Sequence, residues 1–287
     1  MMPGVRKALA VFGIALAAGL AHAVDLTVAL TPSRDPTLLQ AAGNDLATYL
    51  TESLGVKTRA IVASDYTGVV EALRSKNVDL AFIHSAGYVM AAREARARII
   101  VKTIREGSPD YASRIFVLKK SGIRSLEELR GKTIAFVDPT SSSGYIYPLV
   151  LFIKKGLVKN KDPKTFFKNM VFAGAHDAAL LALLNGSVDA AAAFDHAPER
   201  LLKDPARIEP LTYIAETPRI PNDGACVRDG LSQEFVERIR AALLNLNEPG
   251  GKPLLKKLYN IDGLVPATHE DYAPVVEAMN LLSFPGK

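Results

Sequence analysis

Apolar runs of strand length alternate with longer helical stretches in this chain, and this alternation is the strongest constraint on its fold. Leu26–Leu30 is apolar throughout, and residues 38–54 carry an amphipathic repeat that ends at Gly55. Further strands are predicted over 56–62, 78–83, 133–137, 166–172, 188–194 and 225–227, and further helices over 177–184, 233–246 and 253–258, with another starting at 64–66. Strands that alternate with helices are typical of an α/β sheet, largely parallel.

A short internal repeat relates two parts of the chain. The letters AL and VD at residues 72–79 recur at residues 182–189, an offset of 110 residues from 72 to 182. Ligands of open α/β sheets bind outside the carboxyl ends of the strands. Two similar lobes that face each other would therefore bring matching strand ends to one cleft. The offset pairs Thr31 with Ser141, Tyr66 with His176, and Ser85 with Asp195.

The stretch 132–155 has the order of an anion site: a strand, a turn rich in hydroxyl groups, and an apolar helix. The turn carries Ser141, Ser142 and Ser143 before Gly144. The first N–H groups of a helix have no internal partner and carry partial positive charge, and serine hydroxyls add rotatable donors. A nucleotide-binding P-loop needs a lysine after the glycine, and this chain has Tyr145 there. An ordinary serine cap remains the alternative.

Residues 1–23 predict a secretory signal peptide. Two basic residues precede a short apolar run over residues 8–20, and AHA at 21–23 has the form of a cleavage site. The apolar run is shorter than the roughly 20 residues that span a membrane. We expect cleavage after Ala23 and export of the mature chain to the periplasm. An uncleaved membrane anchor is the alternative.

Charge and cysteine content exclude several classes of function. The net charge of +5 falls by two, to +3, when the basic residues of the predicted signal peptide are removed. Without a Lys/Arg stripe, we expect no nucleic-acid partner. The single cysteine, Cys226, excludes an internal disulfide and a Cys-rich zinc site, and we expect neither a metal nor a cofactor. Cys226 is expected to be a buried strand residue, with a thiophilic ligand such as arsenite as the alternative.

Four motifs together carry a resemblance to a known family. They are DYTGVVEALRSKNVDLAFIH, PDYASRIFVLKKSGIRSLEELRGKTIAFVDPTSSSGYIYP, GAHDAALLALLNGSVDAAAAFD and IPNDGACVR, in this order across nearly all of the mature chain. The chain resembles the phosphonate/phosphite-binding periplasmic components of ABC transporters. That family more often has Ser-Thr-Ser-Gly where this chain has Ser-Ser-Ser-Gly, a departure that keeps the hydroxyl group.

The resemblance implies a two-lobed periplasmic-binding-protein fold of type II, a clamshell with a mostly parallel sheet in each lobe and the ligand in the cleft. It assigns residues 24–115 to the first lobe, 116–211 to the second, and 212–287 to a return to the first lobe with C-terminal helices. It implies ligand contacts at Tyr66, Tyr111, Ser141, Ser142, Ser143, His176, Asp195 and Asp223. The internal repeat adds Ser85.

The two carboxylates are the residues expected to discriminate between ligands. Asp195 and Asp223 repel a fully deprotonated oxyanion and accept a hydrogen bond from a P–OH group or an amine. This favours a protonated phosphorus oxyanion or an aminophosphonate over sulfate. His176 donates one ring N–H when neutral and two when charged. Each of these residues also has an ordinary structural interpretation, as a cap, a turn residue or a packed ring.

The resemblance implies a binding protein and not an enzyme. It would capture a small phosphorus oxyanion, such as phosphite or a phosphonate, for the permease of an ABC importer, and act as a monomer. The alternative is a periplasmic sensor that presents its ligand, arsenite included, to a two-component kinase. A hydrolase that uses serine and His176 is a third class, and the chain has no G-x-S-x-G motif. The sequence leaves open which oxyanion is bound.

We predict that the exported protein begins at Val24. A small residue at position 23 is required for signal cleavage, so replacing Ala23 by Phe should leave the precursor uncut. N-terminal sequencing of the exported protein checks both statements. Recovery of wild-type protein that still carries residues 1–23 in the membrane fraction would contradict them.

Overall fold

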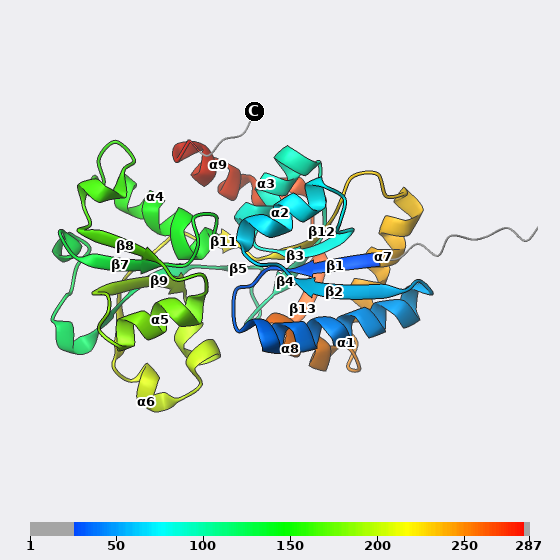
Figure 1. The fold of residues 1–287 in the computed structure, drawn as a ribbon, viewed down its shortest axis with the longest axis horizontal. Coiled ribbons are helices and arrows are strands. Elements are labelled where there is room, and N and C mark those ends of the chain that lie inside the picture. Colours follow the sequence, from blue (N-terminus) through cyan, green and yellow to red (C-terminus); the bar gives the residue numbers. More distant parts are fainter. Residues whose placement is uncertain (1–25, 284–287) are drawn as a thin grey trace, which may run out of the picture.

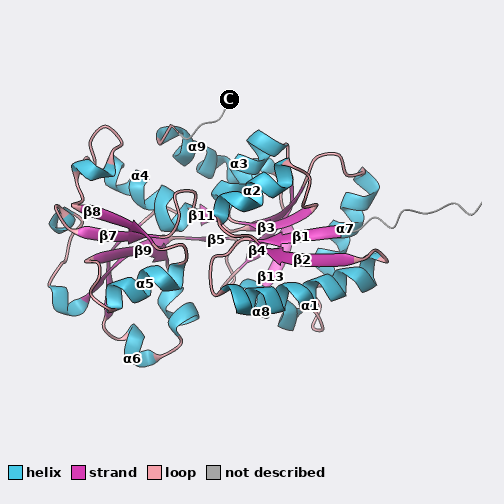
Figure 2. Cartoon of the chain, in the orientation of Figure 1, coloured by secondary structure: helices cyan, strands magenta, loops and turns pink. Residues whose placement is uncertain are grey.

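The structure is a computed structural model that describes residues 26–283, and it consists of two lobes side by side (Figure 1). The predicted signal peptide lies outside the described residues. In each lobe a central sheet carries helices on both of its faces (Figure 2). The predicted two-lobed α/β architecture is confirmed. None of the helices within residues 26–283 is both long and apolar enough to cross a membrane.

The sheet of the first lobe has the order β13-β4-β12-β3-β1-β2. Its strands are β1 (Leu26–Leu30), β2 (Thr58–Val62), β3 (Leu80–Ile83), β4 (Arg98–Ile104), β12 (Gly224–Val227) and β13 (Gly263–Pro266). One face packs against α1 (Pro36–Leu54), α7 (Gln233–Asn245) and α8 (Lys252–Tyr259). The other packs against α2 (Tyr66–Arg74), α3 (Ser85–Ala95) and α9 (Ala273–Leu281). Side chains alternate across a strand, so β1 serves both cores, with Val28 facing one and Ala29 the other.

The sheet of the second lobe has the order β10-β6-β9-β7-β8. Its strands are β6 (Ser113–Leu118), β7 (Thr133–Phe136), β8 (Asn169–Phe172), β9 (Ala190–Phe194) and β10 (Leu211–Glu216). One face packs against α5 (His176–Leu184), the other against α4 (Tyr147–Lys154). The remaining helical segments are α6 (Pro205–Ile208), η1 (Lys119–Ser121), η2 (Glu127–Leu129), η3 (Ser142–Ile146), η4 (Pro163–Thr165), η5 (Pro198–Leu202) and η6 (His269–Tyr272).

Most strands of each sheet run in the same direction, as expected. Neighbouring strands, however, pair in both parallel and antiparallel arrangements. In the first sheet β1 pairs in parallel with β2 and β3, while β12 is antiparallel to both β3 and β4. In the second sheet β7 pairs in parallel with β8 and β9, while β6 is antiparallel to β9 and β10. The antiparallel pairings of β6 and β12 arise because these strands, next to the connections between the lobes, enter each sheet in the reverse direction. At the edge of the first sheet β13 is also antiparallel to β4.

Two short strands cross between the lobes. β5 (Asp110–Tyr111) and β11 (Ile220–Pro221) form an antiparallel pair in which Ile220 lies opposite Tyr111. The predicted lobe boundaries at 115/116 and 211/212 cut through β6 and the start of β10, which both pair within the second sheet. We propose boundaries near residues 112 and 217 instead, because they keep both strands whole.

The internal repeat corresponds to the same contact in both lobes. The Asp79 carboxylate accepts the N–H of Thr27 at 2.8 Å, and the Asp79 N–H donates to the Thr27 carbonyl at 2.9 Å. Asp189 makes the equivalent pair with Thr133, at 2.9 Å in each direction. Each aspartate therefore holds the beginning of the strand next to it. The helices that begin at Tyr66 and His176 occupy equivalent places as well.

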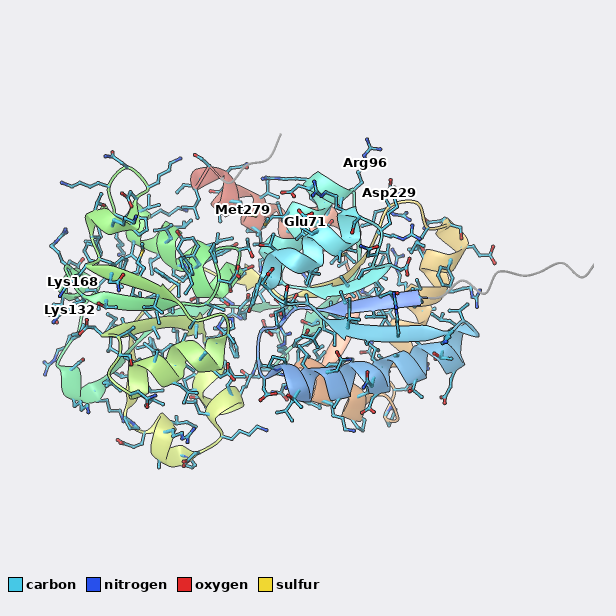
Figure 3. The ribbon with its side chains drawn as sticks, in the orientation of Figure 1. Glu71, Arg96, Lys132, Lys168, Asp229 and Met279 are labelled. Atoms are coloured by element: carbon cyan, nitrogen blue, oxygen red, sulfur yellow. The ribbon has the colours of Figure 1, made fainter. Side chains whose placement is uncertain are left out.

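We predict that Asp79→Ala lowers the free energy of unfolding by about 1.5–3 kcal/mol, because it removes a charged acceptor that also pairs with Arg228 at 2.8 Å. Asp229→Ala is the matched control. Asp229 lies at the surface of the same lobe (Figure 3), and its replacement should change stability by less than about 0.5 kcal/mol. Urea unfolding measures both. Equal stability of the two variants would contradict the structural role of Asp79.

Candidate ligand-binding site

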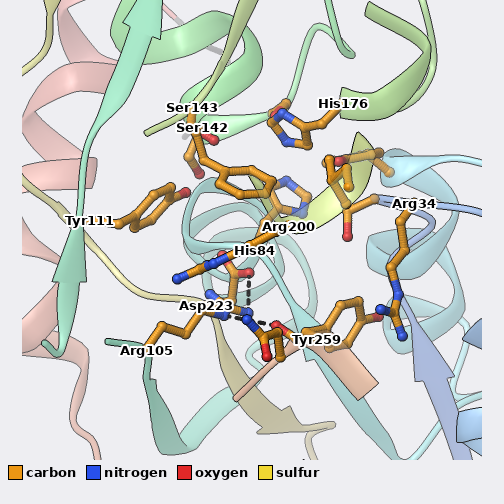
Figure 4. Close-up of a pocket in the computed structure, with 16 residues that line it drawn as sticks. Arg34, His84, Arg105, Tyr111, Ser142, Ser143, His176, Arg200, Asp223 and Tyr259 are labelled. Carbon is orange, nitrogen blue, oxygen red and sulfur yellow. Dashed lines mark hydrogen bonds and ion pairs between the residues drawn. The ribbon is translucent and has the colours of Figure 1, made fainter. Parts of the chain in front are cut away.

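A cavity lies between the lobes, and residues of both lobes line it (Figure 4). Its volume is about 80 Å³. Because one water needs about 10–15 Å³ of such space, the cavity accommodates a ligand of roughly five to eight non-hydrogen atoms. The lining residues are Ser33, Arg34, Tyr66, His84, Arg105, Tyr111, Ser141, Ser142, Ser143, His176, Phe194, Arg200, Leu201, Asp223, Tyr259 and Asn260.

The serine loop, residues 140–144, connects β7 to η3 and α4. Ser141 caps this helical segment, because its hydroxyl oxygen accepts the N–H of Gly144 at 3.1 Å. A Cβ atom at Gly144 would lie only 2.4 Å from the Cβ of Val137. A glycine is therefore needed where the loop passes the end of the strand. Pro148 lies in the first turn of α4, as the sequence predicts.

The serine hydroxyls have their protons available for a ligand. The oxygen of Ser141 already accepts a backbone N–H, and the oxygen of Ser142 accepts the N–H of Ala86 at 2.8 Å. A hydroxyl group has one proton, so an oxygen that accepts in this way directs its own O–H elsewhere. The first N–H groups of η3, those of Ser142 and Ser143, lack intrahelical partners. This end of the cavity therefore offers several donors to an oxyanion.

The serine loop also forms hydrogen bonds between the two lobes. Ala86, at the start of α3, belongs to the first lobe, and Ser142 belongs to the second. Next to this contact, Nε2 of His84 donates to the carbonyl oxygen of Thr140 at 3.0 Å. Both bonds are buried. The two lobes are therefore in contact at the same end of the cavity as the hydrogen-bond donors of the serine loop.

His84 is a site residue that the sequence analysis did not select. Because a carbonyl oxygen only accepts, the bond to Thr140 places a hydrogen on Nε2 of His84. Burial lowers the pKa of His84, although Asp223 acts in the opposite direction. In the neutral ring Nδ1 is then an acceptor, and it is buried without a hydrogen-bond partner within residues 26–283. The partner that this atom lacks is a hydrogen-bond donor.

Tyr66 and His176 begin equivalent helices and both line the cavity, as the sequence predicts. The hydroxyl of Tyr66 and Nδ1 of His176 are buried with no hydrogen-bond partner in the described part of the chain. Burial raises the pKa of Tyr66 well above its ordinary value and lowers the pKa of His176 to about 3. Both side chains are therefore neutral near pH 7 and able to hydrogen-bond a ligand.

Tyr111 and Asp223 also line the cavity. Burial raises the pKa of Tyr111, which keeps its hydroxyl protonated. Asp223 forms an ion pair with Arg105 at 3.1 Å (Figure 4). The negative charge that the sequence analysis assigned to ligand discrimination is thus paired within the protein.

Ser85 and Asp195 do not line the cavity. The Ser85 hydroxyl donates to the carbonyl oxygen of Pro221 at 2.5 Å, and so holds β11. The Asp195 carboxylate accepts the N–H of Ala112 at 3.0 Å and lies 3.6 Å from a guanidinium nitrogen of Arg219. Both residues occur at strand ends, as expected, but the crossing segments occupy the space in front of them. They hold the connections between the lobes rather than the ligand space.

Three arginines of the lining, Arg34, Arg105 and Arg200, were not selected from the sequence. Arg34 and Arg105 lie in the segments that follow β1 and β4, and Arg200 lies in η5. None of the three is a strand-end position that the repeat pairs. Arg200 reaches across the cleft to Glu106 of the first lobe, at 2.7 Å. Only the folded arrangement of the two lobes brings these three side chains to one cavity.

Cys226 lies in the middle of β12 and is fully buried, as expected. Burial raises the pKa of its thiol to about 12, and the residue does not line the cavity. Within residues 26–283 no cluster of three or more His, Cys, Asp or Glu side chains is arranged to hold a metal ion.

The sequence of the chain matches one protein family over most of its length. Residues 28–272 match the family described as "ABC transporter, phosphonate, periplasmic substrate-binding protein". The "Phosphate-import protein PhnD" of Mycolicibacterium smegmatis is 32% identical over 223 residues, which cover 75% of this chain and 70% of that protein. The "Phosphonates-binding periplasmic protein" of Escherichia coli is 31% identical over 214 residues, 72% of this chain and 62% of that protein.

A solved structure has the same fold. PhnD1 from Prochlorococcus marinus, in complex with methylphosphonate, superposes with a TM-score of 0.80 at 22% sequence identity. The superposition covers 90% of this chain and 98% of that one. The expected type II binding-protein fold is confirmed.

We predict that stability falls with acidification through His176. Its pKa is lowered to about 3 by burial, so below about pH 6.5 the unfolded chain takes up a proton that the folded chain rejects. The stability is present above pH 6.5 and is lost as the pH falls towards 3. Between pH 6 and 4, His176→Gln should show a slope smaller by about 1.4 kcal/mol per pH unit. Urea unfolding across this range measures it.

Ser187→Ala is the control for this titration, because Ser187 is exposed, carries no titratable group and lies outside the cavity. It should keep the wild-type slope. An identical slope in wild type and His176→Gln would contradict the prediction.

Proposed function

The chain belongs to the family of periplasmic substrate-binding proteins of phosphonate ABC transporters, and we propose that it captures a small phosphorus oxyanion between its lobes. Phosphite and small phosphonates are the candidate ligands. The observation that carries the proposal is the pair of hydroxyl groups at Ser141 and Ser142, which line the cavity and whose oxygens accept backbone N–H groups, so that their own protons are available to a ligand. The anion lies against these donors and the start of η3.

The size of the cavity and the names of the relatives support the same ligand class. Phosphite and methylphosphonate have four and five non-hydrogen atoms, within or just below the roughly five to eight that the cavity accommodates. A nucleotide is far larger. The relatives are named for phosphate and phosphonates, and PhnD1 was solved with methylphosphonate. A phosphorus oxyanion at the serine loop is consistent with all of these.

Selection against sulfate follows from His84. Its Nδ1 is a buried acceptor, and a buried acceptor that stays unpaired costs about 1–3 kcal/mol. A singly protonated phosphorus oxyanion supplies the missing proton through its P–OH group. Sulfate has no proton near neutral pH and leaves the acceptor unpaired. We propose that the role first assigned to Asp195 and Asp223 belongs to His84, because Asp195 does not line the cavity and Asp223 is paired with Arg105.

The cavity is suited to binding rather than to hydrolysis. Nucleophilic catalysis requires a hydroxyl that is hydrogen-bonded to a base. In residues 26–283 the hydroxyls of Ser141 and Ser142 pair with backbone N–H groups, and no bond joins them to His84 or His176. Captured ligand passes to the permease of an ABC importer from the periplasm, after the signal is cleaved behind Ala23, with the protein acting as a monomer.

We predict that Ser142→Ala weakens binding of methylphosphonate by about 1–3 kcal/mol, or roughly 5- to 150-fold, because the ligand loses a donor and the N–H of Ala86 loses its acceptor. Ser187→Ala, at an exposed position on the second lobe, should bind like wild type. Titration calorimetry with methylphosphonate, phosphite and sulfate measures the affinities.

Unchanged affinity of Ser142→Ala would remove the serine loop from the ligand site. Sulfate binding by wild type as tight as phosphite binding would contradict the role of His84.

A further inference from the structure

The charges of the cavity are unequally distributed between its ends. Ser142 and Ser143 lie on one side in Figure 4, and Arg34 and Tyr259 lie on another. Among residues 26–283, Asp223 is the only carboxylate that lines the cavity, whereas three guanidinium groups line it. The end away from the serine loop therefore carries an excess of positive charge.

Two of the three arginines already have an acidic partner. Arg105 pairs with Asp223 at 3.1 Å, and Arg200 pairs with Glu106 at 2.7 Å. Arg34 has no carboxylate within 4.0 Å in the described residues. Among the three arginines of the cavity, Arg34 is therefore the one without a salt-bridge partner in the described residues.

The contacts of Arg34 leave most of its donors free. One terminal N–H group donates to the carbonyl oxygen of Lys257, near the end of α8. The Nε atom is buried with no hydrogen-bond partner within residues 26–283. A guanidinium has five N–H donors in a planar fork that matches a carboxylate or phosphate. Burial is the largest cause that lowers the pKa of Arg34, and Arg105 acts in the same direction, whereas Tyr259 and Asp35 act in the opposite direction.

The pairing of the nearby carboxylates also disfavours a ligand with an amine. An ammonium group needs a free carboxylate, but Asp223 is paired with Arg105, and Asp195 holds the connection between the lobes. An ammonium group at the far end would also lie close to Arg34, and like charges repel each other.

We propose that the preferred ligand carries a second anionic group, a carboxylate, that binds Arg34 while its phosphonate binds the serine loop. This inference rests on the proposed function, because it places the phosphonate at Ser141–Ser143. It makes Arg34 the residue that determines specificity at the far end of the cavity. Carboxymethylphosphonate, with eight non-hydrogen atoms, is at the upper limit of the roughly five to eight that the cavity accommodates.

Calorimetric titration with methylphosphonate, 2-aminoethylphosphonate and carboxymethylphosphonate tests the inference. A hydrogen-bonded ion pair contributes about 1.5–3 kcal/mol, so carboxymethylphosphonate should bind roughly 10- to 150-fold more tightly than methylphosphonate. The amine should give no such gain. In Arg34→Gln the ratio of the two affinities should fall to about one, and in Arg34→Lys, which keeps the charge but not the fork, to an intermediate value.

Arg74→Gln is the matched control, since Arg74 is exposed, pairs with Glu71 and lies outside the cavity. It should keep the wild-type ratio. Equal binding of methylphosphonate and carboxymethylphosphonate by wild type would overturn the inference and leave the proposed function standing. An affinity ratio that Arg34→Gln does not change would also overturn it. If neither a phosphonate nor phosphite binds, the proposed function fails and the inference fails with it.

Discussion

The hydrogen bond from the N–H of Ala86 to the hydroxyl oxygen of Ser142 connects the binding site to the arrangement of the lobes. It occupies one acceptor position of the Ser142 oxygen, and together with the bond from His84 to Thr140 it holds the second lobe against the first. Behind these polar contacts, α9 and α3 pack against Ile146, Tyr147 and Val150 of the second lobe. In the proposed mode of binding the same atoms contact the ligand and the opposite lobe, so we expect capture of the ligand and closure of the cleft to be coupled.

The acidic residues near the cavity are compatible with the proposed binding of an anion, because their charges are paired within the protein. Asp223 is paired with Arg105 and Asp195 lies beside Arg219, so neither carboxylate presents a free charge to the ligand. In the proposed mode of binding, discrimination between ligands depends on the neutral acceptor of His84 and on Arg34. A neutral acceptor favours a ligand that carries a proton and does not repel the rest of the anion. A free carboxylate would repel it.

Local patterns were sufficient to predict the elements that form the rims of the cleft. The apolar run Leu26–Leu30 is β1 at the predicted bounds, and the offset between residues 72 and 182 marks helices that present Tyr66 and His176 to one cavity.

β4 was not predicted, because Lys102 interrupts its apolar pattern. That lysine is buried only because Asp271, distant in sequence, pairs with it at 3.3 Å. Ser85 and Asp195 were misplaced for a related reason: the crossing strands that cover them are positioned by tertiary structure. Arg34, Arg105 and Arg200 carry no motif and meet only in the folded chain.

A crystal structure of the mature protein with methylphosphonate tests the central claim most directly. The account predicts that phosphonate oxygens lie within about 3.2 Å of the hydroxyl oxygens of Ser141 and Ser142, with Ala86 still bonded to Ser142. It also predicts an oxygen of the ligand within hydrogen-bonding distance of Nδ1 of His84. A phosphonate group held instead among Arg34, Arg105 and Tyr259, with no contact to the serine loop, would contradict the account.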